Sequence, residues 1–217
     1  MYQRDVSEIK AFVRWRGPDA LVNTGLFVLL TIQAGLSTVR GSMVKVQNDG
    51  YDADCLWGKK SDGYKYLVDN ADYLYGKVYD IVDKFGYDTP MGCSEIIRLF
   101  VNVPNMGMVK AGFFAQCLGF NTACLDSHNL KRLDISDSVV KINLKASEGT
   151  IRRKIAGYVT LCHKMVTDPM EQTNTAEYWW NSWCEYVAGN RANRALDTGD
   201  VVSRFHVECI TYGFEHG

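Results

Sequence analysis

The sequence lacks several features that would assign it directly to a class of protein. Its 217 residues include seven cysteines but no CxxC pair, which argues against zinc-ribbon and iron–sulfur sites. The formal net charge is -1, so there is no overall basic excess of the kind that many nucleic-acid-binding proteins show. No apolar run reaches the length of a membrane span, and the charged N-terminus has no secretory signal pattern. We therefore expect no membrane partner.

The cysteines and histidines form no recognisable ligand set. An odd number of scattered cysteines favours free thiols in a reducing intracellular compartment, the cytoplasm or the nucleoid. His163 and His206 have no ligand spacing around them, so we predict no metal site and no cofactor. The cysteines are Cys55, Cys93, Cys117, Cys124, Cys162, Cys184 and Cys209.

What the chain does contain is a typical globular composition with helical patterning. Hydrophobic residues make up 47% and charged residues 23%, and only four prolines occur. The apolar stretch Gly25–Gly35 is expected to be a buried helix, whereas the Gly-, Asp- and Lys-rich stretch 40–63 is predicted as a loop or insertion. No strand pair is convincing, so the predicted fold class is all-α, in one domain over 1–217. The expected helices span 5–14, 18 to about 39, 64–85, 90 to before Pro104, 107–118, 126–133, 148–166, 177–188 and 200–212.

The most informative segment is Val103–Leu133, VPNMGMVKAGFFAQCLGFNTACLDSHNLKRL. Pro104 cannot continue a preceding helix, and Asn105 tolerates a left-handed conformation. Gly107 adopts positive φ at no steric cost. A helix then begins, and its first N–H groups suit a phosphate oxygen because they lack intrahelical partners. The segment predicts a phosphate-binding hairpin, and the alternative is an ordinary corner between helices that binds nothing.

A single carboxylate, Asp126, follows this hairpin and its helix. It lies after an apolar pair and before a short helix, where an aspartate commonly caps the helix. A half-buried carboxylate beside a cleft can also stabilise positive charge on a deoxyribose or activate water. Both roles are compatible if the side chain lies between the helix start and the cleft.

Together these motifs resemble the helix-hairpin-helix (HhH-GPD) DNA glycosylase superfamily, which includes endonuclease III and 8-oxoguanine glycosylase. The family pattern is L-P-G-V-G-x-K-T-A, a hydrophobic helix and V-D-T-H-V-x-R, and this chain has V-P-N-M-G-M-V-K-A and L-D-S-H-N-L-K-R. The resemblance covers Val103–Leu133. It places Asp126 on the essential aspartate of the family and Gly107 on the second hairpin glycine. Ser127 and His128 fall on its Thr-His pair.

Two departures from the family pattern concern the chemistry. Asn105 replaces the first hairpin glycine. Bifunctional members have a Schiff-base lysine two positions after the second glycine, where this chain has Val109. Lys110 comes one residue later, about 100° further around the helix. We expect Lys110 to point elsewhere, toward a phosphate for example, so the resemblance implies a monofunctional enzyme that uses water.

The resemblance also implies a set of DNA contacts. Backbone N–H groups around Met106, Gly107 and Met108, beside Asn105, would hold a phosphate, with Lys110 as a helper and as a catalytic candidate with Asp126. Basic side chains offer further contacts, and the alternative for each is a solvated helix face. They are Lys131 with Arg132, Arg152 with Arg153 and Lys154, and Arg191 with Arg194.

A base that leaves the DNA stack needs an aromatic pocket, and Trp179, Trp180 and Trp183 are the candidates for it. Consecutive aromatics face different sides of a helix, so at least one of Trp179 and Trp180 is expected in the core. His128 is expected to be a hydrogen-bonded structural histidine rather than a general acid. Weaker pocket candidates are Tyr178, Tyr186, Phe12, Trp15 and Tyr64.

The resemblance implies an all-α, two-lobed glycosylase-like fold and a function in base excision repair or DNA modification. The implied reaction is hydrolysis of the N-glycosidic bond of a damaged or modified base in DNA. Two alternatives remain open. The chain can be a non-catalytic HhH module for DNA binding or assembly, or a transferase that acts on modified DNA bases.

Overall fold

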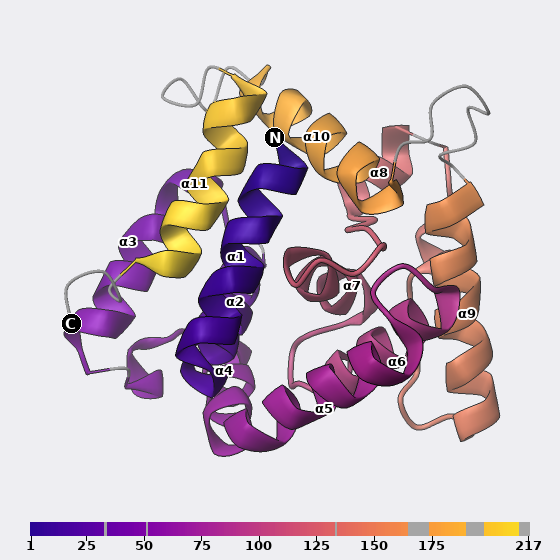
Figure 1. Ribbon diagram of the computed structural model, residues 1–217, viewed down its shortest axis with the longest axis horizontal. Coiled ribbons are helices and arrows are strands. Elements are labelled where there is room, and N and C mark those ends of the chain that lie inside the picture. Colours follow the sequence, from indigo (N-terminus) through magenta and orange to yellow (C-terminus); the bar gives the residue numbers. More distant parts are fainter. Residues whose placement is uncertain (33, 51, 133, 165–173, 190–197, 213–217) are drawn as a thin grey trace.

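The computed structural model describes residues 1–217 except 33, 51, 133, 165–173, 190–197 and 213–217. The described residues form helices and connections without strands, which confirms the all-α class (Figure 1). None of the helices in this described part has the length and apolar character needed to cross a membrane. The helices are α1 (Tyr2–Arg16), α2 (Pro18–Leu30), α3 (Leu36–Asn48), η1 (Ala53–Cys55), α4 (Lys59–Asp69), α5 (Ala71–Phe85), α6 (Pro90–Phe100), α7 (Met108–Cys117), α8 (Ser127–Arg132), η2 (Asp137–Val139), α9 (Glu148–Lys164), α10 (Thr175–Ala188) and α11 (Gly199–Thr211).

The central helix is α2, which is buried from Ala20 to Leu30 and packs against α1, α3, α4, α5, α7 and α11. Its neighbours approach closely at Gly25, where an added Cβ would lie 2.6 Å from Leu67 Cδ1 and 3.1 Å from the Phe114 ring. The apolar sequence of α2 is therefore explained by burial on all sides. The expected buried helix is confirmed as far as Leu30.

The first half of the chain differs from the sequence prediction in its helix boundaries. The helix that begins at Pro18 ends at Leu30 instead of about Val39. The Thr31 hydroxyl donates to the Val28 carbonyl at 2.6 Å, which satisfies one of the last carbonyls of α2. A short connection then leads into α3. This early end of α2 brings Thr31 to the surface of the pocket described below.

The predicted loop over 40–63 is wrong at both ends, because α3 continues to Asn48 and α4 begins at Lys59. The described residues between these two helices form a connection that contains only the short η1. The single helix predicted over 64–85 is also wrong, because Asn70 separates α4 from α5. Asn70 Nδ2 donates to the Tyr66 carbonyl at 2.8 Å, and a side chain that bonds local backbone in this way competes with helix continuation. The helices predicted from residue 90 onward are confirmed with small shifts of their ends.

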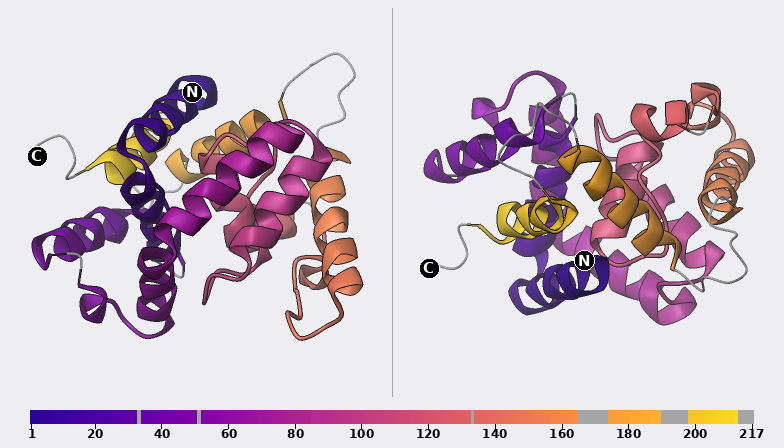
Figure 2. Two further views of the ribbon diagram at one scale, coloured as in Figure 1. Left: turned by 60° about the horizontal axis from the view of Figure 1, so that its bottom comes forward. Right: turned by 90° about the horizontal axis from the view of Figure 1, so that it is seen from above.

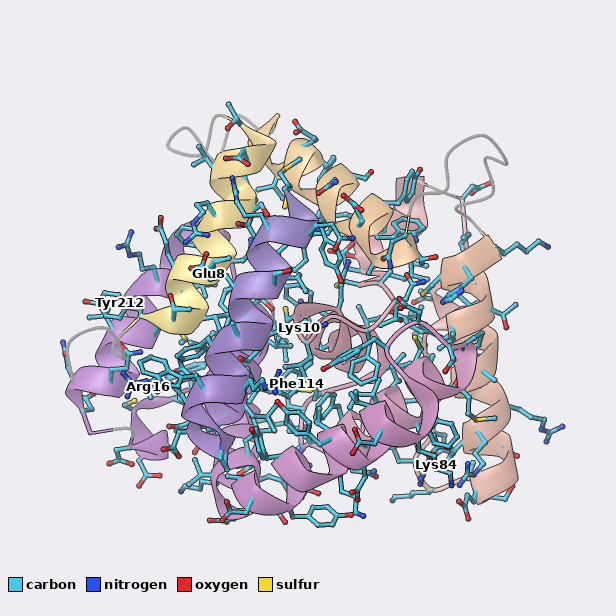
Figure 3. The ribbon with its side chains drawn as sticks, in the orientation of Figure 1. Glu8, Lys10, Arg16, Lys84, Phe114 and Tyr212 are labelled. Carbon is cyan, nitrogen blue, oxygen red and sulfur yellow. The ribbon has the colours of Figure 1, made fainter. Side chains whose placement is uncertain are left out.

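The helices from both ends of the chain lie side by side. In Figure 1, α1 and α11 run next to each other, with α2 behind them, and the two helices pack together. Buried Asp5 on α1 accepts from Ser203 Oγ at 2.5 Å and from Arg204 Nη1 at 3.2 Å on α11. Figure 3 shows Glu8 where α1 faces α11, and Arg204 also binds it, at 2.6 Å.

The middle of the chain packs on the other side of α2. Helix α6 contacts α5, α7 and α9, and Phe100 of α6 stacks on Phe114 of α7 with a 4.1 Å centroid separation. Figure 3 labels Phe114 in the interior of the molecule. The right-hand view of Figure 2 shows α10 between α11 and the segment that contains α8, with α3 and α9 at opposite sides. The site described next lies among these segments.

Candidate functional site

A pocket of about 640 Å³ lies where five parts of the chain meet. Its walls include a phenylalanine, three tryptophans and a tyrosine, together with one carboxylate and one lysine. These parts fall into three groups along the sequence, and more than 50 positions separate each group from the next. The lining residues are Thr31, Ile32, Ala34 and Gly35 of the α2–α3 connection; Lys110, Phe113 and Gln116 of α7; Cys124, Asp126, Ser127 and His128; Trp179, Trp180, Trp183, Cys184, Tyr186 and Val187 of α10; and His206 of α11.

Asp126 lines this pocket and also caps α8, so the two roles expected of it are geometrically compatible. Its Oδ1 accepts from the backbone N–H groups of His128 at 3.1 Å and Asn129 at 3.0 Å. Its Oδ2 accepts from Trp183 Nε1 at 3.2 Å. Three donors therefore fix the orientation of a half-buried carboxylate.

The backbone before Asp126 is held by Tyr158 of α9. The Tyr158 hydroxyl donates to the Ala123 carbonyl at 2.7 Å and accepts from the Leu125 N–H at 3.1 Å. Gly112 of α7 makes room for this arrangement, because an added Cβ would lie 2.6 Å from the Ala123 carbonyl oxygen and 2.8 Å from the Tyr158 hydroxyl. The small residue in α7 thus allows the Asp126 segment to pack directly on that helix.

Lys110 points into the pocket, contrary to the sequence expectation that it points elsewhere. Its Nζ donates to Thr31 Oγ1 at 3.0 Å and lies 5.4 Å from the centroid of the Phe113 ring. The expectation was based only on the angle around the helix between Val109 and Lys110. The sequence does not show where the α2–α3 connection lies, and this connection provides the partner of the lysine. Lys110, Asp126 and Cys124 all line this pocket.

The tryptophans of α10 form one wall of the pocket. Trp179 and Trp180 are both buried, and both still line the pocket; Trp183 is half-buried. Trp179 Nε1 donates to the Cys162 carbonyl at 3.2 Å, and Trp180 Nε1 donates to Ser203 Oγ at 2.7 Å. The residues predicted from sequence as a base pocket are therefore brought together with Asp126.

The hairpin differs from prediction in where its turn lies. Asn105 adopts the left-handed conformation, with φ of 64°, as expected. Gly107 does not have positive φ: it is extended, with φ of -68° and ψ of 176°, because the reversal is complete at Asn105 and Gly107 serves as the N-cap of α7. The Met106 N–H is bonded to the Val103 carbonyl at 3.0 Å, so it is not available to a phosphate.

Exposure in the hairpin limits how it can contact a ligand. The side chains of Met106 and Met108 are buried, whereas Asn105 and Gly107 are exposed. No backbone hydrogen bond is formed by the Gly107 or Met108 N–H within the described part of the chain. A phosphate at this corner would therefore meet the backbone donors of these two residues.

The remaining predicted residues are dispersed. At the mouth of the pocket, His128 Nδ1 lies 3.4 Å from the Tyr186 hydroxyl, and both residues are exposed. Lys131 is exposed; the side chain of Arg132 and all of Arg191 and Arg194 lie outside the described residues. Arg152 pairs with Glu95 and Glu148, Arg153 bonds within α9, and Lys154 bonds the Ser138 carbonyl. Phe12 and Tyr64 are core residues, and exposed Trp15 and Tyr178 do not line the pocket.

The pocket residues that sequence reasoning missed include Phe113, Gln116, Cys124 and His206. Each is buried or half-buried and resembles an ordinary core residue in the sequence. Burial raises the pKa of the Cys124 thiol to about 12, so it stays protonated near neutral pH and is not a nucleophile. Only the packing of α11 against α2 and α10 brings His206 to the site.

No group of side chains suited to hold a metal ion is found among the described residues. Comparisons of the chain with protein-family models, with curated proteins and with solved structures found no match.

Proposed function

We propose that this protein is a DNA glycosylase-like enzyme that hydrolyses the N-glycosidic bond of a damaged or modified base. The observation that supports this most is the convergence of Asp126, Lys110 and the α10 tryptophans on one pocket. A flipped base requires aromatic walls of this kind, and its sugar requires a carboxylate at the mouth. Asp126 is suited to that place because its neighbours Ser127 and His128 are exposed.

The two charges of the pocket match the charges that develop in the reaction. When the bond between C1′ and the base nitrogen breaks, its electron pair leaves with the base and the sugar becomes cationic. The Asp126 carboxylate stabilises the sugar, and the Lys110 ammonium stabilises the departing base. Water then forms a bond to C1′, and its proton passes to the base nitrogen. The three hydrogen bonds to Asp126 hold the carboxylate in place throughout.

In this proposal the hairpin holds the DNA backbone beside the target nucleotide. The Gly107 and Met108 N–H groups at the start of α7 suit a phosphate oxygen, and exposed Lys131 lies in the last turn of α8, the helix that Asp126 caps. Lys110 lies in the first turn of α7, so the same helix start connects this corner to the pocket. The two lobes of the expected fold would be the group of α1, α2, α3 and α11 and the group of α5 to α9.

The proposal is tested with duplexes that contain uracil, 8-oxoguanine, alkylated or hypermodified bases, followed by heating in alkali to reveal abasic sites. Asp126→Asn is the informative variant, because asparagine still caps α8 but cannot neutralise a cationic sugar. We expect wild-type protein to produce abasic sites and the variant to be slower by about 100-fold or more.

Tyr178→Phe serves as the matched control, because Tyr178 lies on α10 outside the pocket. It should leave the rate unchanged. Binding to all duplexes without any abasic product, with no effect of Asp126→Asn, would instead support a non-catalytic DNA-binding module. A loss of binding at high salt would distinguish that module from a protein that binds only other proteins.

A further inference from the structure

His206 is a buried histidine in the wall of the pocket, and the reaction above does not use it. It is 1% exposed, and its ring packs against the rings of Phe27, Phe113, Trp180 and Trp183 at centroid distances of 5.0 to 6.1 Å. A fully buried polar group usually has hydrogen-bond partners for all its polar atoms. Only one of the two ring nitrogens of His206, Nδ1, has such a partner among the described residues.

Nδ1 of His206 lies 2.6 Å from the carbonyl oxygen of Val202, one turn earlier in α11. A carbonyl oxygen can only accept, so Nδ1 must carry the hydrogen. Burial lowers the pKa of His206 to about 4, although the hydrogen bond to Val202 acts in the opposite direction. The ring is therefore neutral near pH 7, and its Nε2 is an acceptor without a hydrogen.

Nε2 of His206 has no hydrogen-bond partner among the described residues. Side-chain atoms of the described residues that are buried without a hydrogen-bond partner include Asn23 Oδ1 and Gln47 Oε1. Nε2 of His206 also lacks a hydrogen-bond partner, but it is not among the atoms that are fully shielded from solvent. It is therefore accessible from the pocket that His206 lines.

We propose that His206 Nε2 accepts a hydrogen bond from an N–H group on the far edge of a nucleobase held in the pocket. This assignment rests on the proposed function, because it assumes that the molecule bound in the pocket is a nucleobase. The sugar and backbone must remain at the mouth, beside Asp126, so the edge opposite the sugar reaches His206. The substrate class is then a base that keeps an N–H donor on this edge, and a base alkylated there is rejected because Nε2 would be left unpaired.

The test uses small compounds that enter the pocket without DNA. Titration calorimetry compares 1-methyluracil, which has an N3–H donor, with 1,3-dimethyluracil, which does not. A second pair is 9-methyladenine and N6,N6,9-trimethyladenine. We expect wild-type protein to bind each donor compound about 5-fold to 100-fold more tightly than its methylated partner. His206→Phe should remove the difference, and His163→Phe, outside the pocket, should keep it.

Nitrogen NMR of the wild-type protein provides a readout that does not depend on the stability of a variant. The His206 ring should show a hydrogen on Nδ1 only, and the Nε2 resonance should shift with 1-methyluracil but not with 1,3-dimethyluracil. Equal binding of both members of each pair, or no binding of any compound, would overturn the assignment. Neither result depends on the formation of abasic sites. A failure of this inference can therefore be distinguished from a failure of the proposed function.

Discussion

Single residues set the chemistry of this pocket through their nearest partners. The position of Asp126 could be predicted because its cap is local: its backbone donors are two and three residues away. The direction of Lys110 could not be predicted, because its partner Thr31 is 79 positions away. The same holds for Trp183, whose bond to Asp126 spans 57 positions. Local motifs thus locate the carboxylate, and only the fold supplies its surroundings.

The position of Lys110 gives a prediction about the course of the reaction. A lysine in the pocket can act as a fixed charge or as a nucleophile that forms a Schiff base with the sugar. The hydrolytic proposal assigns it the first role. We expect sodium borohydride to trap no protein–DNA adduct with wild-type protein, and Lys110→Met to slow base release by about 10-fold or more.

Lys60→Met is the control for this experiment. Lys60 Nζ donates to the Leu30 carbonyl at 3.3 Å near Lys110, but it does not line the pocket. It should leave the rate within a few-fold of wild type. A borohydride adduct that forms with wild-type protein and disappears in Lys110→Met would show that the hydrolytic assignment is wrong.

At the scale of elements, the helices with strong local signals were predictable. Thr89 caps α6, which has Pro90 in its first turn. Gly86, with positive φ, ends α5. Both boundaries can therefore be predicted from the local sequence. The boundaries at Leu30 and Asn70 were not, because a hydroxyl or amide that bonds back to the helix has no unambiguous sequence pattern. Stretch 40–63 was misjudged because α3 and α4 are held by tertiary packing despite their polar composition.

The close packing of α7 on the Asp126 segment gives a prediction for stability. Gly112→Ala places a methyl group against the Ala123 carbonyl and the Tyr158 hydroxyl, so the segment must move. We expect a loss of about 1–3 kcal/mol in the free energy of unfolding, measured by thermal or urea denaturation. Gly157→Ala in α9 meets nothing within 4 Å and should stabilise the protein by about 0.5–1 kcal/mol. Equal effects of the two substitutions would contradict the packing described for α7.

At the scale of the whole molecule, the pocket depends on the two ends of the chain meeting. Helix α11, which supplies His206, is fixed to α1 by buried Asp5 with Ser203 and Arg204. Asp5 also pairs with Arg4 at 2.8 Å. Nothing in the local sequence around Asp5 indicates a partner about 200 positions later, which is why the sequence did not predict the position of α11.

This network predicts an acid-sensitive stability. Burial raises the pKa of Asp5, but the hydrogen bonds from Arg4, Ser203 and Arg204 outweigh it and hold the pKa below its ordinary value. A carboxyl with a lowered folded pKa contributes stability above its ordinary pKa of about 4, and the contribution is lost as the pH falls through the folded pKa. The melting temperature should therefore decline below about pH 4 more steeply in wild type than in Asp5→Asn.

The same variant should be less stable at neutral pH. We expect Asp5→Asn to lose about 3 kcal/mol at pH 7, because it leaves the arginines without their buried partner. Asp200→Asn, which removes only an exposed partner of Arg4, should change stability by about 0.5 kcal/mol or less. Parallel pH profiles of wild type and Asp5→Asn would refute the role given to Asp5.

The central claim is that the pocket removes a base from DNA with the help of Asp126. The mass spectrum of the duplex strands after incubation tests it most directly, because it does not require the target base to be known. With at least one of the modified duplexes, wild-type protein should yield a strand that has exchanged one base for a hydroxyl group, and Asp126→Asn should not. A strand that keeps every base but gains a new group would indicate a transferase. Unchanged strands throughout would contradict the account.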